Sequence, residues 1–429
     1  MLSYTYLSQN QTLFHDLGLP AYLYSGEGAT MVVTQRPPFA VTSSIAEGFS
    51  ITRGGPLHWL LVRLGQAGDG RRLVLRRALA AVLITWLPLL ILSAVDGVAW
   101  GRQIKIPFLR DLAINVRLLI AVPILILSES KIDRRWRSLV LEFLRTGLVS
   151  GDVLPSFEKI LERTARWRDS VFPETVLALI AFIPSLSIVK TELLMSGNSN
   201  WHTLSTGALS AAGWWFNLVS TPLFRFLLLR WIWRMFLWTS FLWSVSRIKL
   251  YLVATHTDLA AGLGFLSEGQ KAFSPIVFAG GAVIAAQVGN AIAYEGESLS
   301  SVKFLMIAYG VLAVLFLIVP LLVVVPVLLK VKRKALLDYG AQVTIHNQLF
   351  DQKWIHNNRP AGETLLGNAD ASSLADLGSS FTVVRQMQLV PIDKPTLIAL
   401  AISAALPMIP VVFYATPTDE LVALLKMLA

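Results

Sequence analysis

The sequence predicts an all-α, polytopic helical membrane protein with about seven transmembrane helices and amphipathic helices outside the membrane. Hydrophobic residues make up 54% of the 429 positions and charged residues only 15%. Apolar stretches of about 20 residues, enough to cross ~30 Å of hydrocarbon as a helix, recur along the chain. The seven stretches are Ala78–Val95, Leu112–Leu127, Val171–Val189, Trp214–Leu229, Ala272–Ala293, Phe304–Leu329 and Thr396–Tyr414.

The amino-terminal region, residues 1–75, precedes the first span and is predicted to be cytoplasmic. It contains Pro37-Pro38 and lacks the apolar core of a signal peptide, so we expect the first span to insert uncleaved. The chain has no cysteine, which excludes disulfides, cysteine-bound zinc and thiol nucleophiles.

Basic residues give the expected orientation. Most of the 37 lysines and arginines lie before span one or in the connections after spans two, four and six. The positive-inside rule therefore predicts a cytoplasmic amino terminus and an outer carboxyl terminus. The net charge of +10 results mostly from the basic residues that set this topology, and it predicts attraction to anionic lipid headgroups. Nucleic acid is not an expected partner.

This orientation divides the chain into six parts. Residues 76–130 form a transmembrane hairpin, and 131–170 form a cytoplasmic helical hairpin with apolar residues at helical spacing. Residues 171–330 hold spans three to six, with an aromatic and basic helix expected at headgroup level within 230–270. A cytoplasmic segment occupies 331–394, and the last span with a short outer tail occupies 395–429.

Polar residues inside the spans are the candidates for a functional path. Arg117 lies in the middle of span two, and Arg225 lies in span four. The full set expected to line a pore or ion path is Arg110, Asn115, Arg117, Arg225, Gln287 and Asn290. The alternative for Arg117 is a structural ion pair with Glu174, Asp111 or Asp96.

Spans five and six carry features of close packing and of bending. Gly280-Gly281 and the alanines that follow them favour close helix–helix or subunit contact. Pro320 and Pro326 each remove a backbone hydrogen bond from span six. They predict either a hinge used in gating or a static kink.

The segment Thr255–Leu266 is the most distinctive local string and precedes span five. His256, Asp258, Gly262 and Gly264 are candidates for a ligand-binding or gating loop, in which backbone amides would meet an anion. The alternative is a tight entry loop with Asp258 as a helix cap. Two potential ligands are too few for a metal site, so we expect no metal and no cofactor.

Three strings together resemble a family of uncharacterised multi-pass bacterial inner-membrane proteins. They are Asn115–Pro123, Thr255–Leu266, and Ser373–Gly378 followed by Val383–Arg385. The family loop is closer to His-Pro-Asp-x-Ala-Gly-Gly-Leu-Gly-Phe, from which Thr257 and Ala261 depart. The resemblance implies a bacterial inner membrane and carries no activity.

The sequence leads to three hypotheses about function. The first is a homo-oligomeric channel or transporter subunit for a small, anionic ion. The second is a membrane scaffold or sensor that binds a partner or lipid through its cytoplasmic helices. The third is an enzyme acting on lipid headgroups through His256 or Asp258; without a known catalytic motif, the sequence favours a protein that is not an enzyme.

Overall fold

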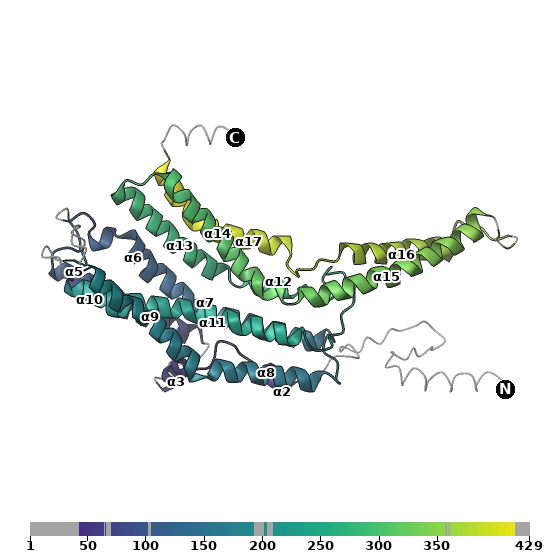
Figure 1. Cartoon of the computed structure of the whole chain (residues 1–429), viewed down its shortest axis with the longest axis horizontal. Coiled ribbons are helices and arrows are strands. Elements are labelled where there is room, and N and C mark those ends of the chain that lie inside the picture. The colour runs from purple at the N-terminus through teal and green to yellow at the C-terminus, as the bar shows by residue number, and fades with distance from the viewer. Residues whose placement is uncertain are drawn as a thin grey trace.

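The chain folds into long helices that run side by side (Figure 1). The computed structural model describes residues 43–63, 65, 70–101, 104–192, 201–203, 209–356, 358, 360 and 362–416. Within this part of the chain the regular elements are all helical, and the pairing of Thr203 with Leu209 is an isolated bridge. The predicted all-α class is confirmed.

Five helical stretches in the described part of the chain are long and apolar enough to cross a membrane, so the chain has the features of an integral membrane protein. They are Arg71–Val95, Leu112–Arg145, Leu266–Glu295, Leu299–Leu322 and Lys394–Ala415. The first contains α4 (Arg71–Thr85) and α5 (Leu87–Val95), and the second contains α6 (Leu112–Val116), the π-helical turn η2 (Arg117–Ala121) and α7 (Val122–Arg145). Each agrees with a predicted span, although α7 continues well past the predicted end at Leu127.

Predicted spans three and four are helical as well. The third lies in α9 (Val171–Glu192), which contains the apolar stretch Val171–Ser185. The fourth lies in α10 (Ala211–Trp215), η3 (Phe216–Ser220) and α11 (Thr221–Val245). No separate headgroup-level helix follows it. α11 instead runs on without a break, and both Arg230 and Arg234 are buried within the protein.

An aromatic core holds the amino-terminal helices against the far ends of α7 and α11. It joins α2 (Ser44–Gly48) and α8 (Leu154–Asp169) to the bundle, while α3 (Pro56–Arg63) contributes no residue to this core and contacts α9. Trp136 and Trp238 stack with ring centroids 5.2 Å apart, and Phe143 contacts both Phe157 and Phe241. The sequence predicts that α8 pairs with α7 in a helical hairpin. In the structure α8 packs mainly along α11, and it also contacts α7 through the rings of Phe157 and Phe143.

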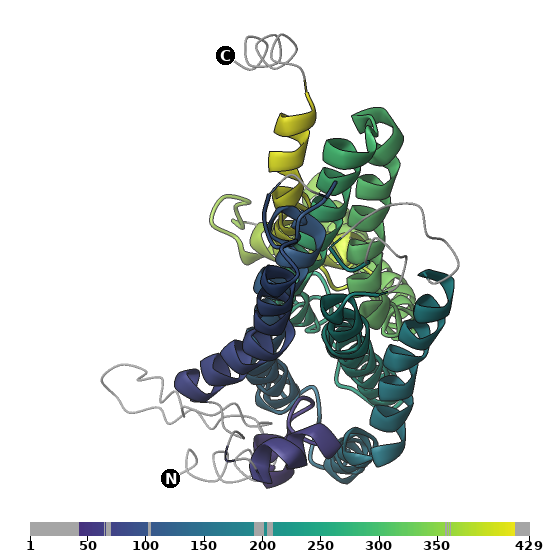
Figure 2. The ribbon, with the colours of Figure 1, turned by 90° about the vertical axis from the view of Figure 1, so that its left-hand side faces the viewer.

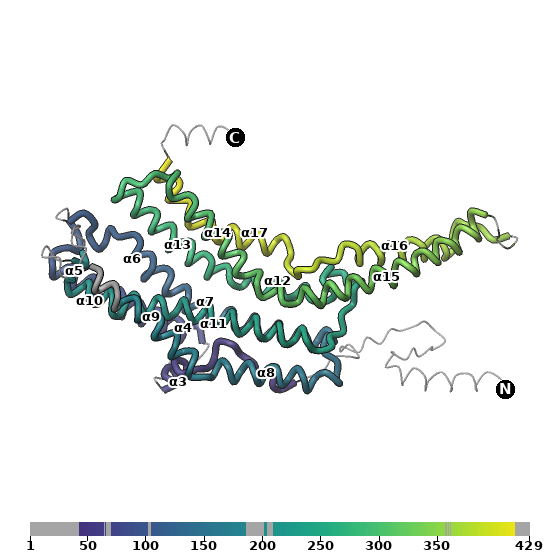
Figure 3. Tube along the Cα trace, in the orientation of Figure 1, coloured from purple at the N-terminus to yellow at the C-terminus, as the bar shows by residue number. Residues whose placement is uncertain are grey.

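The two prolines of predicted span six mark a break between helices. α14 (Leu299–Leu322) ends soon after Pro320, and Pro326 lies in the first turn of α15 (Val325–Phe350), where proline is tolerated. The predicted span Phe304–Leu329 therefore stops at Leu322. Beyond the break, α15, η5 (Asp351–Ile355) and α16 (Ala369–Gln386) form an antiparallel arm that extends past the other helices (Figure 3).

The helix α13 (Ser274–Asn290) lies at the centre of the remaining elements. These are α12 (Leu266–Lys271), η4 (Ala291–Glu295), α17 (Lys394–Ala405), η6 (Leu406–Met408), α18 (Ile409–Ala415) and the short η1 (Phe108–Arg110). Figure 2 shows α14, α17 and α18 on the side of the bundle opposite α2 and α3. A Cβ on Gly280 would lie 2.4 Å from the Tyr309 hydroxyl, and one on Gly281 would lie 2.7 Å from the carbonyl of Ala404. The small residues of span five thus serve contacts within the chain.

Candidate functional site

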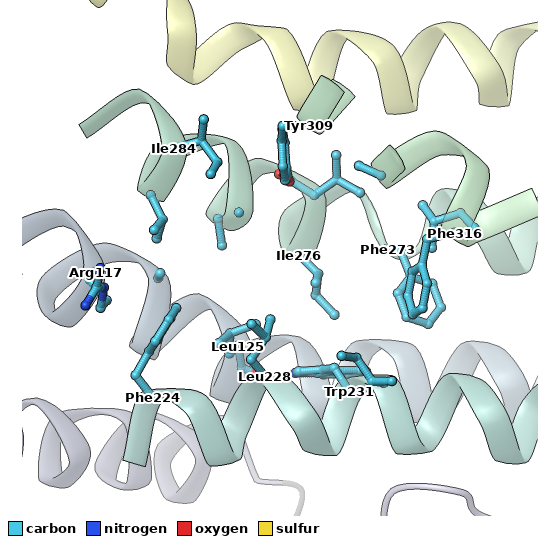
Figure 4. Close-up of a pocket in the computed structure, with 18 of the residues that line it drawn as sticks. Arg117, Leu125, Phe224, Leu228, Trp231, Phe273, Ile276, Ile284, Tyr309 and Phe316 are labelled. Carbon is cyan, nitrogen blue, oxygen red and sulfur yellow. Dashed lines mark hydrogen bonds between the residues drawn. The ribbon is translucent and has the colours of Figure 1, made fainter. Parts of the chain in front are cut away.

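A cavity of about 450 Å³ lies between α7, α11, α13 and α14. Figure 4 shows its residues projecting from these helices toward a common space. The walls are mostly apolar: Leu125, Phe224 and Trp231 lie on one side, and Phe273 and Ile276 on the other. Such a space, enclosed by aromatic and aliphatic side chains with few polar groups, has the composition of a ligand pocket rather than of a water-filled pore.

Arg117 is the cation of this cavity. It stands at the start of the π-helical turn η2, where one extra residue per turn shifts the following side chains around the helix axis. Its guanidinium lies 5.4 Å from the ring centroid of Phe224, a cation–π contact. Its Nε is buried and has no hydrogen-bond partner among the described residues. The carboxylate that acts on this charge is that of Asp111, which makes no ion pair with Arg117 in the described part of the chain, so the Nε proton is available to a ligand in the cavity.

The cavity reaches the molecular surface along α11, α13 and α14. Leu228 and Ile232 of α11 and Phe316 of α14 line it and are 40%, 47% and 41% exposed. Gln287 of α13 is an exposed lining residue as well. Since these helices belong to the apolar part of the bundle, a hydrophobic molecule in the bilayer has a route to Arg117.

Two of the six predicted path residues, Arg117 and Gln287, line this cavity together. Asn115 has a different role: its amide nitrogen donates to the carbonyls of Phe108 and Asp111, and its oxygen accepts from the Trp86 indole. Through these bonds Asn115 stabilises the start of α6. It does not line the cavity.

Asn290 and Asp111 form a second polar contact at the same end of the bundle. The Asn290 amide donates to the Asp111 carboxylate at 2.8 Å, and the Trp201 indole donates to the other carboxylate oxygen at 3.0 Å. Asn290 also accepts from the amide of Leu112. We call these residues, with Asn115, the polar knot. It ties α6 to the end of α13 and occupies both Asp111 and Asn290.

The last two predicted path residues lie apart from the cavity. The Arg110 side chain is exposed; its backbone amide donates to the carbonyl of Pro107, and its carbonyl accepts from the Tyr294 hydroxyl. Arg225 donates to Ser185 of α9 at 3.2 Å. The six residues therefore do not form one path through the described part of the chain.

A group of buried charges lies farther along α7 and α11. The sequence did not predict that these residues would meet. The Glu129 carboxylate accepts from Arg234 at 2.8 Å and from Arg230 at 3.3 Å, and lies 3.7 Å from Arg77. Arg230 also pairs with Glu174 at 3.1 Å. We call these five residues the charge cluster. Glu174, one of the partners considered for Arg117, is thus engaged by Arg230.

The sequence contained a signal for the charge cluster. Glu129 follows the apolar stretch of span two by two positions, and Arg230 follows that of span four by one. Spans two and four run in the same direction, so acidic and basic residues at their carboxyl ends are expected to pair, because an unpaired charge is costly to bury. The predicted assignment of Arg230 and Arg234 to a headgroup-level helix concealed this match.

Asp258 fills the predicted ligand loop with its own carboxylate. The carboxylate accepts the backbone amides of Ala260, Gly262 and Gly264 at 2.8, 3.1 and 2.8 Å. His256 Nδ1 lies 2.8 Å from it. Burial raises the pKa of Asp258, but the three amide hydrogen bonds together outweigh burial and hold this pKa below its ordinary value. The amides proposed to meet an anion are therefore already occupied.

The backbone of this loop is strained at residues that are not glycine. Leu259 and Ala261 have φ of 56° and 55°, in the left-handed region that favours glycine. Ala261 is one of the two departures from the resembled family's loop, which has glycine there. The loop is also anchored from outside, since the amide of Gln388 donates to the carbonyl of Leu259. These contacts give Thr255–Leu266 the role of a structural joint.

Comparison with known proteins adds no relative: no protein-family model, curated protein or solved structure matches the chain. The resemblance noted from the sequence rests on its three strings alone. The support for a functional site is therefore the cavity and the position of Arg117 in its wall.

Proposed function

We propose that the chain is an integral membrane transport protein that binds an amphiphilic anion in the cavity beside Arg117. The observation that carries this proposal is a guanidinium that forms no ion pair in the described part of the chain, has an unpartnered Nε, and faces an apolar cavity that opens on the bundle surface. The proposal keeps the predicted transport role and the predicted anion. It replaces the small ion with a molecule that has an apolar tail.

The walls of the cavity favour an amphiphile over a hydrated ion. A small inorganic anion would exchange its water shell for the rings of Phe224, Trp231 and Phe273, which supply no comparable hydrogen bonds. An alkyl or aryl tail would instead gain roughly 25 cal/mol for each Å² of apolar surface that it buries. Arg117 and Gln287 would hold the anionic group at the end of the cavity nearer the polar knot.

A binding measurement tests the role of Arg117. Trp231 lines the cavity, so a brominated alkyl sulfonate bound there should quench its fluorescence, and the Trp231→Phe variant should lose that part of the signal. We expect Arg117→Gln to weaken sulfonate binding about tenfold, since a charge-assisted contact is worth about 1.5–3 kcal/mol. The matched brominated alcohol should bind both proteins equally.

Arg110→Gln is the matched control, because its side chain is exposed and lies outside the cavity. Equal sulfonate affinity in the parent protein and Arg117→Gln would contradict the proposal. Transport itself is tested in proteoliposomes with a fluorescent alkyl sulfonate and, separately, with chloride. Flux of neither above that of empty vesicles would reject transport, and flux of chloride alone would favour the small-ion channel.

The proposed cellular setting follows the basic residues of the sequence. We propose a bacterial inner membrane, a cytoplasmic amino terminus and an outer carboxyl terminus. A homo-oligomer remains part of the proposal, but α13 is a poor candidate for the subunit contact because α6, α14 and α17 already cover it. Crosslinking in membranes, read as a ladder of multiples of the chain mass, tests it.

A scaffold role has one specific observation in its favour. The arm formed by α15 and α16 exposes Leu337, Ile345 and Leu349 at 76%, 51% and 59% on α15. An apolar row of this kind on a projecting helix is typical of a protein contact. A pull-down whose stoichiometric partner is lost in Ile345→Glu but kept in Gln348→Glu would support the scaffold. The headgroup-enzyme hypothesis loses its main candidates, because Asp258 is bound by three amides.

A further inference from the structure

A second pocket of about 450 Å³ lies between α7 and α12, away from the Arg117 cavity. It is lined by Lys131, Arg134, Arg135, Ser138, Glu268, Lys271 and Ala272. We call it the basic pocket. Four of its seven lining residues are cationic and one is anionic, so its charge is opposite to that of a phosphate.

One ion pair inside the basic pocket leaves three cations available. Arg135 Nη2 lies 2.5 Å from Glu268 Oε2, and Arg135 Nε also donates to the carbonyl of Glu268. This pair joins α7 to α12. Lys131, Arg134 and Lys271 are exposed and make no ion pair with any carboxylate in the described part of the chain. Three positive groups and the Ser138 hydroxyl thus face a notch with no remaining acid.

The notch is built by close packing of the two helices. A Cβ on Gly269 would lie 2.5 Å from Leu139, so α12 can rest directly on α7 only because this residue is glycine. Trp136 lies beside the same contact, with its ring 5.4 Å from that of Phe273. The backbones that carry the cations are therefore fixed before any ligand binds, which lowers the entropic cost of binding.

The basic pocket lies beside the apolar surface of two predicted spans. On α7, the exposed Leu127 belongs to the apolar stretch, and Lys131 comes one turn later. On the other wall, Lys271 ends α12, and the apolar helix α13 begins at Ser274. Cations within one turn of the apolar surface lie where phosphates of the bilayer lie. A lipid seated there could keep its acyl chains in the hydrocarbon.

We propose that the basic pocket between α7 and α12 is a binding site for the phosphate of an anionic membrane lipid. Arg134 and the two lysines supply the charge, and Ser138 supplies a hydroxyl donor. The site is separate from the Arg117 cavity and shares no lining residue with it. Its test therefore does not depend on the proposed transport role.

The test is native mass spectrometry of the full chain in detergent with added phosphatidylglycerol or phosphatidylcholine. We expect the variant Lys131→Gln/Arg134→Gln/Lys271→Gln to bind phosphatidylglycerol about tenfold more weakly than the parent. The control Lys159→Gln/Arg163→Gln/Arg166→Gln removes the same charge from exposed positions on α8 and should bind like the parent. Equal losses in both variants would overturn the site, because general attraction would explain them.

Two further measurements separate the other outcomes. Ser138→Leu fills the notch without changing charge and should also weaken phosphatidylglycerol binding; an unchanged affinity in this variant would overturn the pocket. Inorganic phosphate at millimolar concentration should not displace the lipid, and displacement would assign the site to free phosphate instead. Equal binding of phosphatidylcholine would overturn the requirement for an anionic lipid.

Discussion

Two groups of arginines inside the bundle differ in how their charge is balanced. Arg230 and Arg234 are buried beside Glu129 at 3.3 and 2.8 Å, and Arg230 adds a contact with Glu174. Arg117 has no such partner; it stacks on Phe224 and faces an apolar cavity. The sequence had placed Arg117 inside span two, and Arg230 and Arg234 just beyond span four in a helix expected at headgroup level.

The difference separates a structural charge from a binding charge. In the charge cluster, the cost of burying each ion is offset by an opposite ion and by hydrogen bonds. At Arg117 the offset is smaller, because Asp111 acts on it without forming an ion pair and its Nε makes no hydrogen bond in the described part of the chain. A bound anion would supply the contact that the protein leaves unmade. The comparison makes opposite predictions for the two groups: loss of stability when the cluster is broken, and loss of ligand when Arg117 is replaced.

The largest effect is expected from Glu129→Gln. This change removes the carboxylate shared by Arg77, Arg230 and Arg234, so that Arg234 stays buried without its 2.8 Å partner while Arg230 keeps Glu174. Breaking a buried pair in this way costs about 3–5 kcal/mol of unfolding free energy. Denaturant unfolding in mixed micelles, or the thermal unfolding temperature, measures it.

The matched control for Glu129→Gln is Glu162→Gln, which makes the same chemical change on the exposed face of α8. It should stay within about 0.5 kcal/mol of the parent. If the two variants lost equal stability, the charge cluster would have no structural role and the contrast with Arg117 would fail.

The second effect concerns a charge balanced by the backbone instead of by a counter-ion. Asp258→Asn should lower the free energy of unfolding by about 2 kcal/mol at pH 7, because three buried amides lose an ionised acceptor. The Asp258 pKa is lowered in the folded protein, so its contribution is complete above the unfolded carboxyl pKa of about 3.9 and is lost as pH falls through the folded value.

The difference between the parent protein and Asp258→Asn should therefore shrink as pH falls below about 4. Unfolding measured across pH 2–7 tests this sign. Asp376→Asn, an exposed position on α16, should give the same stability as the parent at every pH. A difference for Asp258→Asn that grows in acid would contradict the assignment of its three amide bonds.

The charge cluster and the cavity also show which features of the fold and the candidate site can be predicted from the sequence. Hydropathy predicted the helical membrane class and placed five spans correctly, because apolar length is a local property. It could not show that Glu174 faces Arg230 and not Arg117, since a helix pattern gives relative faces and not the neighbour that each face meets. Arg117 and Gln287 line one cavity, whereas Asn115 and Asn290 belong to the polar knot with Asp111 and bond to Trp86 and Asp111, respectively.

A smaller loss of unfolding free energy is expected from a substitution in the cavity wall. Gly280→Ala should destabilise the protein by about 1 kcal/mol, because the added Cβ would lie 2.4 Å from the Tyr309 hydroxyl. That hydroxyl donates to the carbonyl of Val277 and would have to move. In the Tyr309→Phe background the same alanine should cost less. A double-mutant cycle on the unfolding free energy measures this coupling, and additive effects would exclude the contact.

The smallest stability effect, and the sharpest test of the comparison, is expected from Arg117→Met. Methionine keeps much of the apolar stem that packs on Phe224 and removes a guanidinium that forms no ion pair in the described part of the chain, so the unfolding free energy should stay within about 1 kcal/mol of the parent. Arg234→Met, the same change inside the charge cluster, should lose several times more unfolding free energy, because Glu129 keeps its charge and loses its 2.8 Å partner.

Sulfonate binding should respond in the reverse order, falling about tenfold in Arg117→Met and remaining unchanged in Arg234→Met. Parallel losses of stability in the two variants would mean that Arg117 is held by the fold in the same way as Arg234, and the cavity would then have no free charge to offer a ligand.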